Sequence, residues 1–133
     1  MTILRLVLFS EVSTPPPELQ LRSTESPKSG CTTHYLLMLA AEAVGFLSLD
    51  RTEHELGIYE IWIRSDKRRQ GLARHCLCLI EELAASESRT GLWVRPVPLS
   101  PDTAADELVN LYVNTGYRPD RADPELWRKW LQV

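Results

Sequence analysis

Apolar residues recur along this chain at two spacings, one typical of helices and the other of strands. Between Gln70 and Ser86 they recur at helical intervals, which predicts an amphipathic helix. Its predicted apolar face comprises Leu72, Cys76, Leu79, Ile80 and Leu83, and its outer face Arg74, Glu81, Glu82 and Glu87. A second helix is predicted from Pro101 to Asn114, ended by Gly116 in a C-cap position.

Short apolar runs bounded by polar turns predict the strands. These runs cover residues 2–9, 34–40, 43–50, 56–64, 91–97, 117–119 and 126–133. The second, third and fourth runs follow one another through short turns, and turns of that length favour antiparallel hairpins. The segment 10–31 follows neither spacing. It is rich in Pro, Ser and Thr, which predicts a loop with at most one helical turn near 18–22.

The resulting order is strand, loop, three strands, helix, strand, helix and one or two further strands. With 133 residues and no internal repeat, we expect one domain over residues 1–133 with a mixed α+β fold. Apolar content of 44% and charged content of 25% are typical of a soluble globular protein. No apolar run is long enough to cross a bilayer, and we interpret residues 1–9 as a first strand rather than a signal sequence.

The three cysteines are Cys31, Cys76 and Cys78. The last two lie two positions apart on a predicted helix and so point away from each other. This spacing argues against a disulfide framework and against a metal site. It favours reduced, buried thiols in a cytoplasmic protein.

Positive charge is concentrated in residues 64–75. This segment holds five basic residues against one acidic residue, a local charge of +4, which leaves −7 for the rest of a chain whose net charge is −3. A lone basic patch on an acidic body fits a compact anion better than a nucleic-acid track. A solvated loop before a helix is the alternative explanation.

The basic segment contains Arg68-x-x-Gly71-x-Ala73 between the strand 56–64 and the helix 70–86. Unpaired backbone N–H groups at a helix start attract anions, and small residues allow a diphosphate to approach the backbone. Neither of the two common nucleotide-binding loop patterns occurs in the chain. We therefore expect a different phosphate-bearing cofactor.

A second motif, Leu111-Tyr112, three residues, then Gly116-Tyr117, ends the late helix. The two motifs in this order resemble the GNAT superfamily of acyl-coenzyme A-dependent N-acyltransferases, and the resemblance covers about residues 33–119 plus the first strand. It implies a mainly antiparallel sheet of six to seven strands with helices on both faces. The N-terminal helices of that fold would here be reduced or replaced by the Pro/Ser-rich segment.

The resemblance also implies acetyl-coenzyme A (acetyl-CoA) as the cosubstrate, with no metal. Its diphosphate would lie on the backbone amides of residues 69–74, and Arg68 would add charge, unless it is simply solvated. The pantetheine arm would run along the main chain of Ile61 and Ile63, with the Trp62 side chain facing the other way. The expected cofactor-binding residues are thus Ile61, Trp62, Ile63, Arg68, Arg69, Gln70, Gly71, Leu72, Ala73 and Arg74.

Two residues are candidates for the chemistry. Tyr112 matches the family tyrosine that protonates the departing CoA thiolate, and its alternative role is to pack the late helix against the sheet. Glu60, a carboxylate in an otherwise apolar strand, is the candidate base that deprotonates the attacking ammonium. Its alternative is a solvent-facing or edge position. His54 and Glu55 are weaker candidates, and neither His34 nor His75 is expected to take part.

The loop-like segment 10–31 would leave the acceptor site open, which favours a peptide or protein amine or a site completed by a partner subunit. The asparagine often found at the start of the family's late helix is also missing, since Ala105 lies near that position. A small-molecule amine stays open as the alternative acceptor. We expect a monomer or a homodimer, with Trp127 and Trp130 as candidates for the dimer face. Three functions therefore remain open: an N-acetyltransferase, a binding or regulatory module of the same fold, and a nucleic-acid binder.

Overall fold

The computed structural model describes residues 3–26, 29–96 and 105–131. Ten regular elements and two 3-10 turns follow one another along this part of the chain. They are β1 (Leu4–Leu8), a 3-10 turn (Phe9–Glu11), α1 (Pro17–Glu25), β2 (Thr32–Leu39), β3 (Glu42–Arg51), β4 (Glu55–Ile63), a 3-10 turn (Ser65–Lys67), α2 (Leu72–Ser86), β5 (Gly91–Val94), α3 (Ala105–Asn114), β6 (Arg118–Pro119) and β7 (Trp127–Trp130).

The strands form one sheet in the order β1-β2-β3-β4-β5-β7-β6. The first four strands are antiparallel neighbours. For β2, β3 and β4 the short turns predicted this pairing, whereas the chain passes from β1 to β2 through the segment that contains α1. The pair β4 and β5 is parallel, because the chain returns through α2 before it adds the next strand. The mixed, mainly antiparallel sheet of the prediction is thereby confirmed within the described residues.

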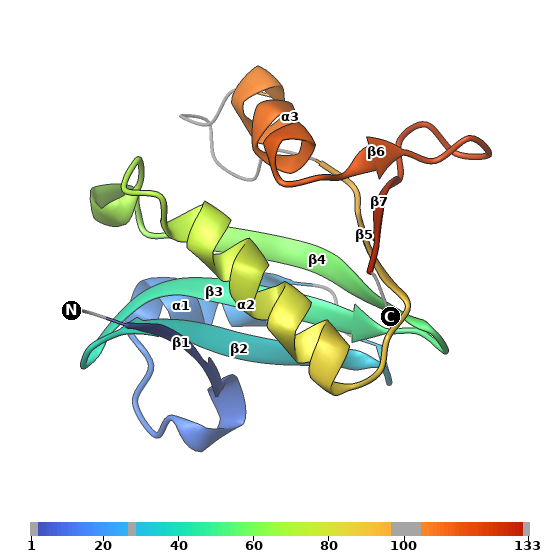
Figure 1. The fold of residues 1–133 in the computed structure, drawn as a ribbon. Helices are drawn as coiled ribbons and strands as arrows, with labels where there is room; N and C mark the ends of the chain where they lie inside the picture. Colours follow the sequence, from blue (N-terminus) through green and yellow to red (C-terminus); the bar gives the residue numbers. More distant parts are fainter. Residues whose placement is uncertain (1–2, 27–28, 97–104, 132–133) are drawn as a thin grey trace.

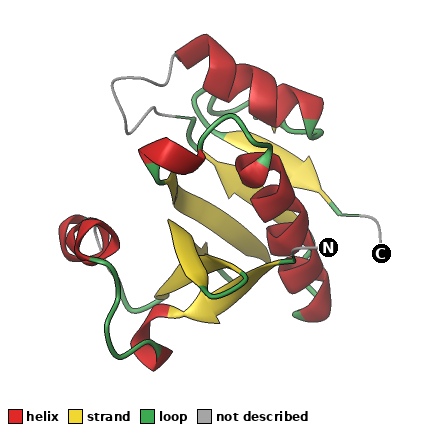
Figure 2. Cartoon of the chain, turned by 90° about the vertical axis from the view of Figure 1, so that its left-hand side faces the viewer, coloured by secondary structure: helices red, strands yellow, loops and turns green. Residues whose placement is uncertain are grey.

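Helices cover both faces of the sheet (Figures 1 and 2). Helix α2 lies on one face, where Leu72, Cys76 and Ile80 join the main apolar core together with residues of α3. Helix α1 lies on the opposite face, where Leu19 packs with Leu36, Ala43 and Phe46. The two cores are separated by the sheet, so each side of β4 faces a different environment.

The prediction for residues 10–31 was wrong in extent. Instead of one turn near 18–22, α1 runs over nine residues from Pro17. Proline is well suited to the first helical position, where no N–H partner is needed, so the proline run marks a helix start. Leu19 is completely buried, and docking on the sheet supplies the stability that the weak apolar pattern of this helix does not provide. The N-terminal helical region is nevertheless short.

Several other predicted boundaries and environments changed. Helix α2 starts at Leu72 rather than Gln70, because Gly71 before it has φ +77 and lies outside helical geometry. Of its predicted apolar face, Leu79 and Leu83 are only partly buried, whereas Leu77 and Ala84, which the spacing did not assign, are buried.

Two of the cysteines were also misjudged. Cys76 is buried, whereas Cys31 and Cys78 are exposed, and all three are free thiols. Position 78 lies on the outer side of α2, since two helical positions subtend about half a turn.

The predicted strand ends at 97 and 132–133 and the predicted helix start at 101 lie outside the described residues. No described helix has both the length and the apolar character needed to span a membrane.

Candidate active site

The two parallel strands β4 and β5 separate partway along their length. Their pairing covers Glu55–Ile58 against Gly91–Val94 and ends there, although β4 continues to Ile63. On its other side β4 stays paired with β3 up to Ile63. The second half of β4 therefore has backbone groups that face the separation and make no ladder with a described strand.

A bulge at Tyr59 reverses the alternation of side chains in β4 at this point. Ser48 pairs with Glu60 and the next residue, Leu49, pairs with Ile58, so Tyr59 is the extra residue. As a result Ile61 and Ile63 lie on the α2 side, while Glu60 and Trp62 lie on the α1 side. The expectation that Trp62 faces away from its two isoleucine neighbours is thus met by the geometry.

The loop after β4 and the start of α2 lie next to this separation, since β4 leads directly into them (Figure 1). Arg69 and Gly71 have positive φ values of 63 and 77. At the helix start the amide of His75 bonds to the carbonyl of Gly71 at 3.1 Å, and no side chain caps the helix. Among the described residues, the amides of Arg69 through Arg74 have no acceptor, so they are available to an anion.

Gly71 is required here by its backbone conformation rather than by close packing. A Cβ at this position would meet nothing within 4 Å, but its φ of +77 is costly for any other residue. Arg69 adopts a similar conformation, and its exposed side chain turns toward Glu107 on α3, with 3.6 Å between the charged atoms. The side chain at this position therefore points to α3.

Arg68 is half-buried, which contradicts the fully solvated alternative. Its Nε donates to the carbonyl oxygen of Ile63 at 2.8 Å, and its guanidinium lies 5.5 Å from the centre of the Trp62 ring. This side chain thus anchors the basic loop to the end of β4.

Much of the remaining charge of the loop is paired within the protein. Arg64 contacts Glu42 at 3.1 Å and Asp66 at 3.0 Å, and Lys67 contacts Glu42 at 3.5 Å. Arg74 is exposed and makes no ion pair with a described residue. This internal pairing weakens the argument for a broad nucleic-acid surface, because a nucleic-acid track requires a continuous stripe of unpaired cations.

Glu60 is neither at a sheet edge nor solvent-facing, so that alternative is wrong. It is 5% exposed in a central strand, and its Oε2 accepts a hydrogen bond from Arg22 Nε at 2.8 Å. This contact raises the pKa of the Arg22 guanidinium above its usual value. The partner could not be identified from the sequence, because the two residues are 38 positions apart and Arg22 lies in the segment 10–31, which was predicted to be mostly loop.

Tyr112 lies on α3 with its ring in the main core and is 3% exposed. Its ring meets that of Tyr117 edge-on, with 5.3 Å between the centroids. Its hydroxyl has no hydrogen bond to a described residue. Burial, with a contribution from Cys76, raises the pKa of Tyr112 well above its ordinary value, so the phenol stays protonated at neutral pH.

The weaker candidates for the catalytic base, Glu55 and His54, lie beside other charged residues. Glu55 accepts a hydrogen bond from Arg128 of β7 at 3.0 Å, and His54 is a surface residue beside Glu53. His75 is exposed on α2. Of the two tryptophans suggested for a dimer contact, Trp127 packs against the core and Trp130 is 65% exposed.

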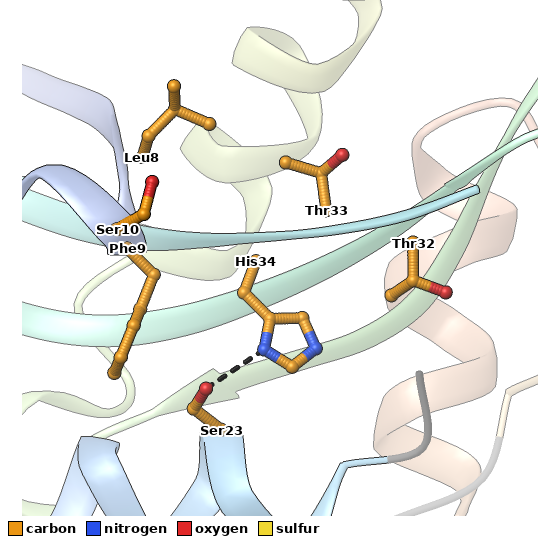
Figure 3. Close-up of a pocket in the computed structure, with 7 residues that line it drawn as sticks. All are labelled: Leu8, Phe9, Ser10, Ser23, Thr32, Thr33 and His34. Carbon is orange, nitrogen blue, oxygen red and sulfur yellow. Dashed lines mark hydrogen bonds between the residues drawn. The ribbon is translucent and has the colours of Figure 1, made fainter. Parts of the chain in front are cut away.

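His34 lies in a pocket that the sequence did not suggest (Figure 3). The pocket has a volume of about 320 Å³ and is lined by Leu8, Phe9, Ser10, Ser23, Thr32, Thr33 and His34. His34 Nδ1 and Ser23 Oγ lie 2.9 Å apart. His34 on β2 and Glu60 on β4 lie opposite Ser48 of β3 from its two sides, and they contact α1 through Ser23 and Arg22, so this pocket lies on the same face of the sheet as Glu60.

Comparison with known proteins agrees with this architecture. The profile of the Acetyltransferase (GNAT) family matches residues 3–117, and the chain belongs to this family. No curated protein matched the sequence.

Solved structures share the fold at low identity. A GNAT family acetyltransferase from Elizabethkingia anophelis with acetyl-CoA bound is 15% identical, with a TM-score of 0.67, over 96% of this chain and 98% of that one. The ribosomal-protein-S18-alanine N-acetyltransferase of Escherichia coli is also 15% identical, with a TM-score of 0.65, over 100% of this chain and 96% of the other. The PaiA N-acetyltransferase of Thermoplasma acidophilum in complex with coenzyme A is 9% identical, with a TM-score of 0.60, over 86% and 68%.

Proposed function

We propose that this protein transfers an acetyl group from acetyl-CoA to a primary amine by direct attack of the amine on the thioester. The observation that carries the proposal is the separation of β4 from β5 beside the unpaired amides of the α2 start. Such a site offers backbone groups along a strand to an amide-rich arm and N–H donors to a diphosphate. Membership of the GNAT family and the CoA-bound neighbours of the same fold support acetyl-CoA as the donor.

In this proposal the pantetheine arm pairs with the main chain of Ile61 and Ile63, which faces the separation. The diphosphate accepts hydrogen bonds from the amides of residues 69–74. Trp62 would not contact the arm, because it lies on the α1 side with Glu60. Its part would be to hold Arg68, and through it the loop.

The reaction moves two protons. Glu60 takes one from the attacking ammonium, whose ordinary pKa is about 10 and which cannot attack while protonated. The neutral nitrogen then forms a bond to the thioester carbon, the carbon–sulfur bond breaks, and Tyr112 donates a proton to the departing thiolate. The nitrogen of the new amide gives its second proton to the Tyr112 phenolate, and Glu60 releases its proton to solvent. Tyr112 carries the proton that this step requires, because burial raises its pKa and keeps the phenol protonated at neutral pH.

A pair of phenylalanine variants tests the role of Tyr112. Replacement of Tyr112 by Phe is expected to lower kcat by about 10²-fold, as is typical for loss of a general acid, with acetyl-CoA binding retained. Tyr117→Phe is the matched control, since Tyr117 is also buried and its hydroxyl has no hydrogen-bond partner among the described residues. Equal turnover in wild type and Tyr112→Phe would show that the assigned role is wrong.

A binding or regulatory module of the same fold is the second candidate. One observation favours it: Arg22 already occupies one oxygen of Glu60, which is nearly sealed from solvent. Mass spectrometry of the purified protein for copurified acyl-CoA, followed by thermal-shift titration, decides between the two. At a hundredfold excess over Kd a ligand stabilises by about 2.7 kcal/mol, so an unchanged melting temperature in excess acetyl-CoA would favour the module.

A further inference from the structure

The ion pair between α1 and β4 is unusual because its carboxylate is almost completely buried. The Glu60 side chain is 3% exposed and that of Arg22 is 21% exposed, with 2.8 Å between the bonded atoms. Removing two charges from water costs several kcal/mol, and an apolar pair in the same place is often as stable or more so. Stability alone therefore does not account for a charged pair at this position.

Two oxygen atoms beside this pair have no donor. Glu60 uses Oε2 for Arg22, and its Oε1 accepts no hydrogen bond from a described residue. Ser48 stands directly opposite Glu60 in the β3–β4 register, is completely buried, and its Oγ has no partner among the described residues. Buried polar atoms are normally paired, so the unpaired Ser48 hydroxyl opposite Glu60, whose Oε1 accepts no bond from a described residue, indicates a place for a polar group that carries donors.

Arg22 has unused donors on the other side of the pair. Its Nε binds Glu60, its Nη1 has only a 3.4 Å contact with the exposed carboxylate of Glu25, and its Nη2 has no partner among the described residues. A guanidinium can bind a carboxylate through two parallel hydrogen bonds. Arg22 can therefore hold a second carboxylate in place of Glu25 while it stays bound to Glu60.

We propose that the acceptor carries a carboxylate next to its amine, as an amino acid does, and binds across the Arg22–Glu60 pair. Its ammonium would donate to Glu60 Oε1 and Ser48 Oγ, and its carboxylate would accept from Arg22. The acceptor's ammonium then lies beside the Glu60 carboxylate and its carboxylate beside the Arg22 guanidinium, so that each charge has a neighbour of opposite sign. This inference rests on the proposed N-acetyltransferase function and narrows its acceptor from primary amines to zwitterions.

The test compares each amino acid with its carboxamide, which keeps the amine and side chain but loses the negative charge. The rate of CoA release from acetyl-CoA gives kcat/KM for a panel of such pairs. The wild type is expected to prefer at least one acid over its amide by roughly tenfold or more, the effect of about one charge-assisted interaction. Equal use of acid and amide across the panel would overturn the inference.

Variants on α1 assign the preference to Arg22. Arg22→Gln is expected to abolish the preference for the acid. Glu25→Gln is the control on the same helix turn, and it should keep or increase the preference because it removes a competing carboxylate. Retained preference in Arg22→Gln contradicts the inference. Faster turnover of amines that lack a carboxylate by Arg22→Gln also contradicts the inference, because it would show that Arg22 blocks access to Glu60.

Two further measurements keep the result interpretable. Ser48→Ala leaves the guanidinium in place, so it should weaken binding of acid and amide alike and leave their ratio unchanged. Equilibrium binding of the same panel to CoA-saturated protein gives the acid-over-amide ratio without turnover. A ratio near one overturns the inference, whereas a clear preference without turnover supports it and shows that the proposed catalytic function has failed.

Discussion

Docking of α1 on the sheet depends on one apolar side chain. Leu19 is 0% exposed and packs with Leu36, Ala43 and Phe46, whereas the rest of the helix contributes the polar contacts of Arg22 and Ser23. Leu19→Ala removes this anchor. Truncation of a buried leucine typically costs about 2–5 kcal/mol, the sum of lost burial and of the cavity that remains.

The short length of α1, nine residues, limits how much of this cost appears in the free energy of unfolding. An isolated helix of this length is not stable in water, so α1 exists only while it is docked. If its docking free energy is smaller than the cost of the cavity, the helix undocks and the rest of the fold persists. We therefore expect Leu19→Ala to lower the free energy of unfolding by about 2 kcal/mol or more, or to release α1 selectively.

Denaturant unfolding and amide hydrogen exchange distinguish the two outcomes. Selective release would raise exchange in residues 17–25 while residues 72–86 of α2 remain protected. Leu21→Ala is the control, because Leu21 lies on the same helix and is 55% exposed, so its loss should change stability by no more than about 0.5 kcal/mol. Wild-type stability and exchange in Leu19→Ala would refute the conclusion that this side chain holds α1 on the sheet.

Two further predictions concern Gly57 in β4 and Glu87 at the C-cap of α2. Gly57→Ala should destabilise the fold by about 1–3 kcal/mol, because its Cβ would lie 2.1 Å from the Trp93 ring. Gly30→Ala, with no atom within 4 Å, should be neutral in the same thermal unfolding assay. Hydrogen bonds from Arg51 lower the pKa of Glu87 below 4.5, so this contact stabilises the fold above that pH and is lost as the pH falls through the lowered pKa. Glu87→Gln should be less stable than wild type at pH 7, with the gap closing under acid, and a constant gap down to pH 2 would contradict this assignment.

Local sequence patterns were sufficient to predict most of the helices and strands whose own residues show a clear apolar spacing or are bounded by polar turns. The apolar spacing of 70–86 predicted α2 to within two residues at its start, because helical periodicity and the glycine before it are properties of neighbouring residues. The hairpins from β2 to β4 followed from short polar turns. Segment 10–31 was misjudged because only Leu19 and Ser23 of α1 are buried, which is too few positions to produce a visible period.

The candidate site likewise contains some residues that could be found in the sequence and others that only the structure revealed. The basic loop, Gly71 and the motif containing Tyr112 and Gly116 could be found in the sequence, since each is a short run with fixed spacing. The sequence identified Glu60 as an isolated carboxylate in an apolar strand, but it did not identify the residues that surround it. Its partner Arg22 comes from a helix 38 residues earlier, and Ser48 comes from the neighbouring strand.

The sequence by itself determined most of the strands and the helices α2 and α3, though not α1, and it located the basic loop before α2. Those features depend on residues that are neighbours along the chain. Only the tertiary structure decided which side of β4 each residue faces, since the bulge at Tyr59 turns Glu60 toward α1 and Ile61 toward α2. The ion pair of Arg22 and Glu60 likewise exists only when α1 docks, because the packing of distant elements brings the two residues together and buries the Glu60 carboxylate.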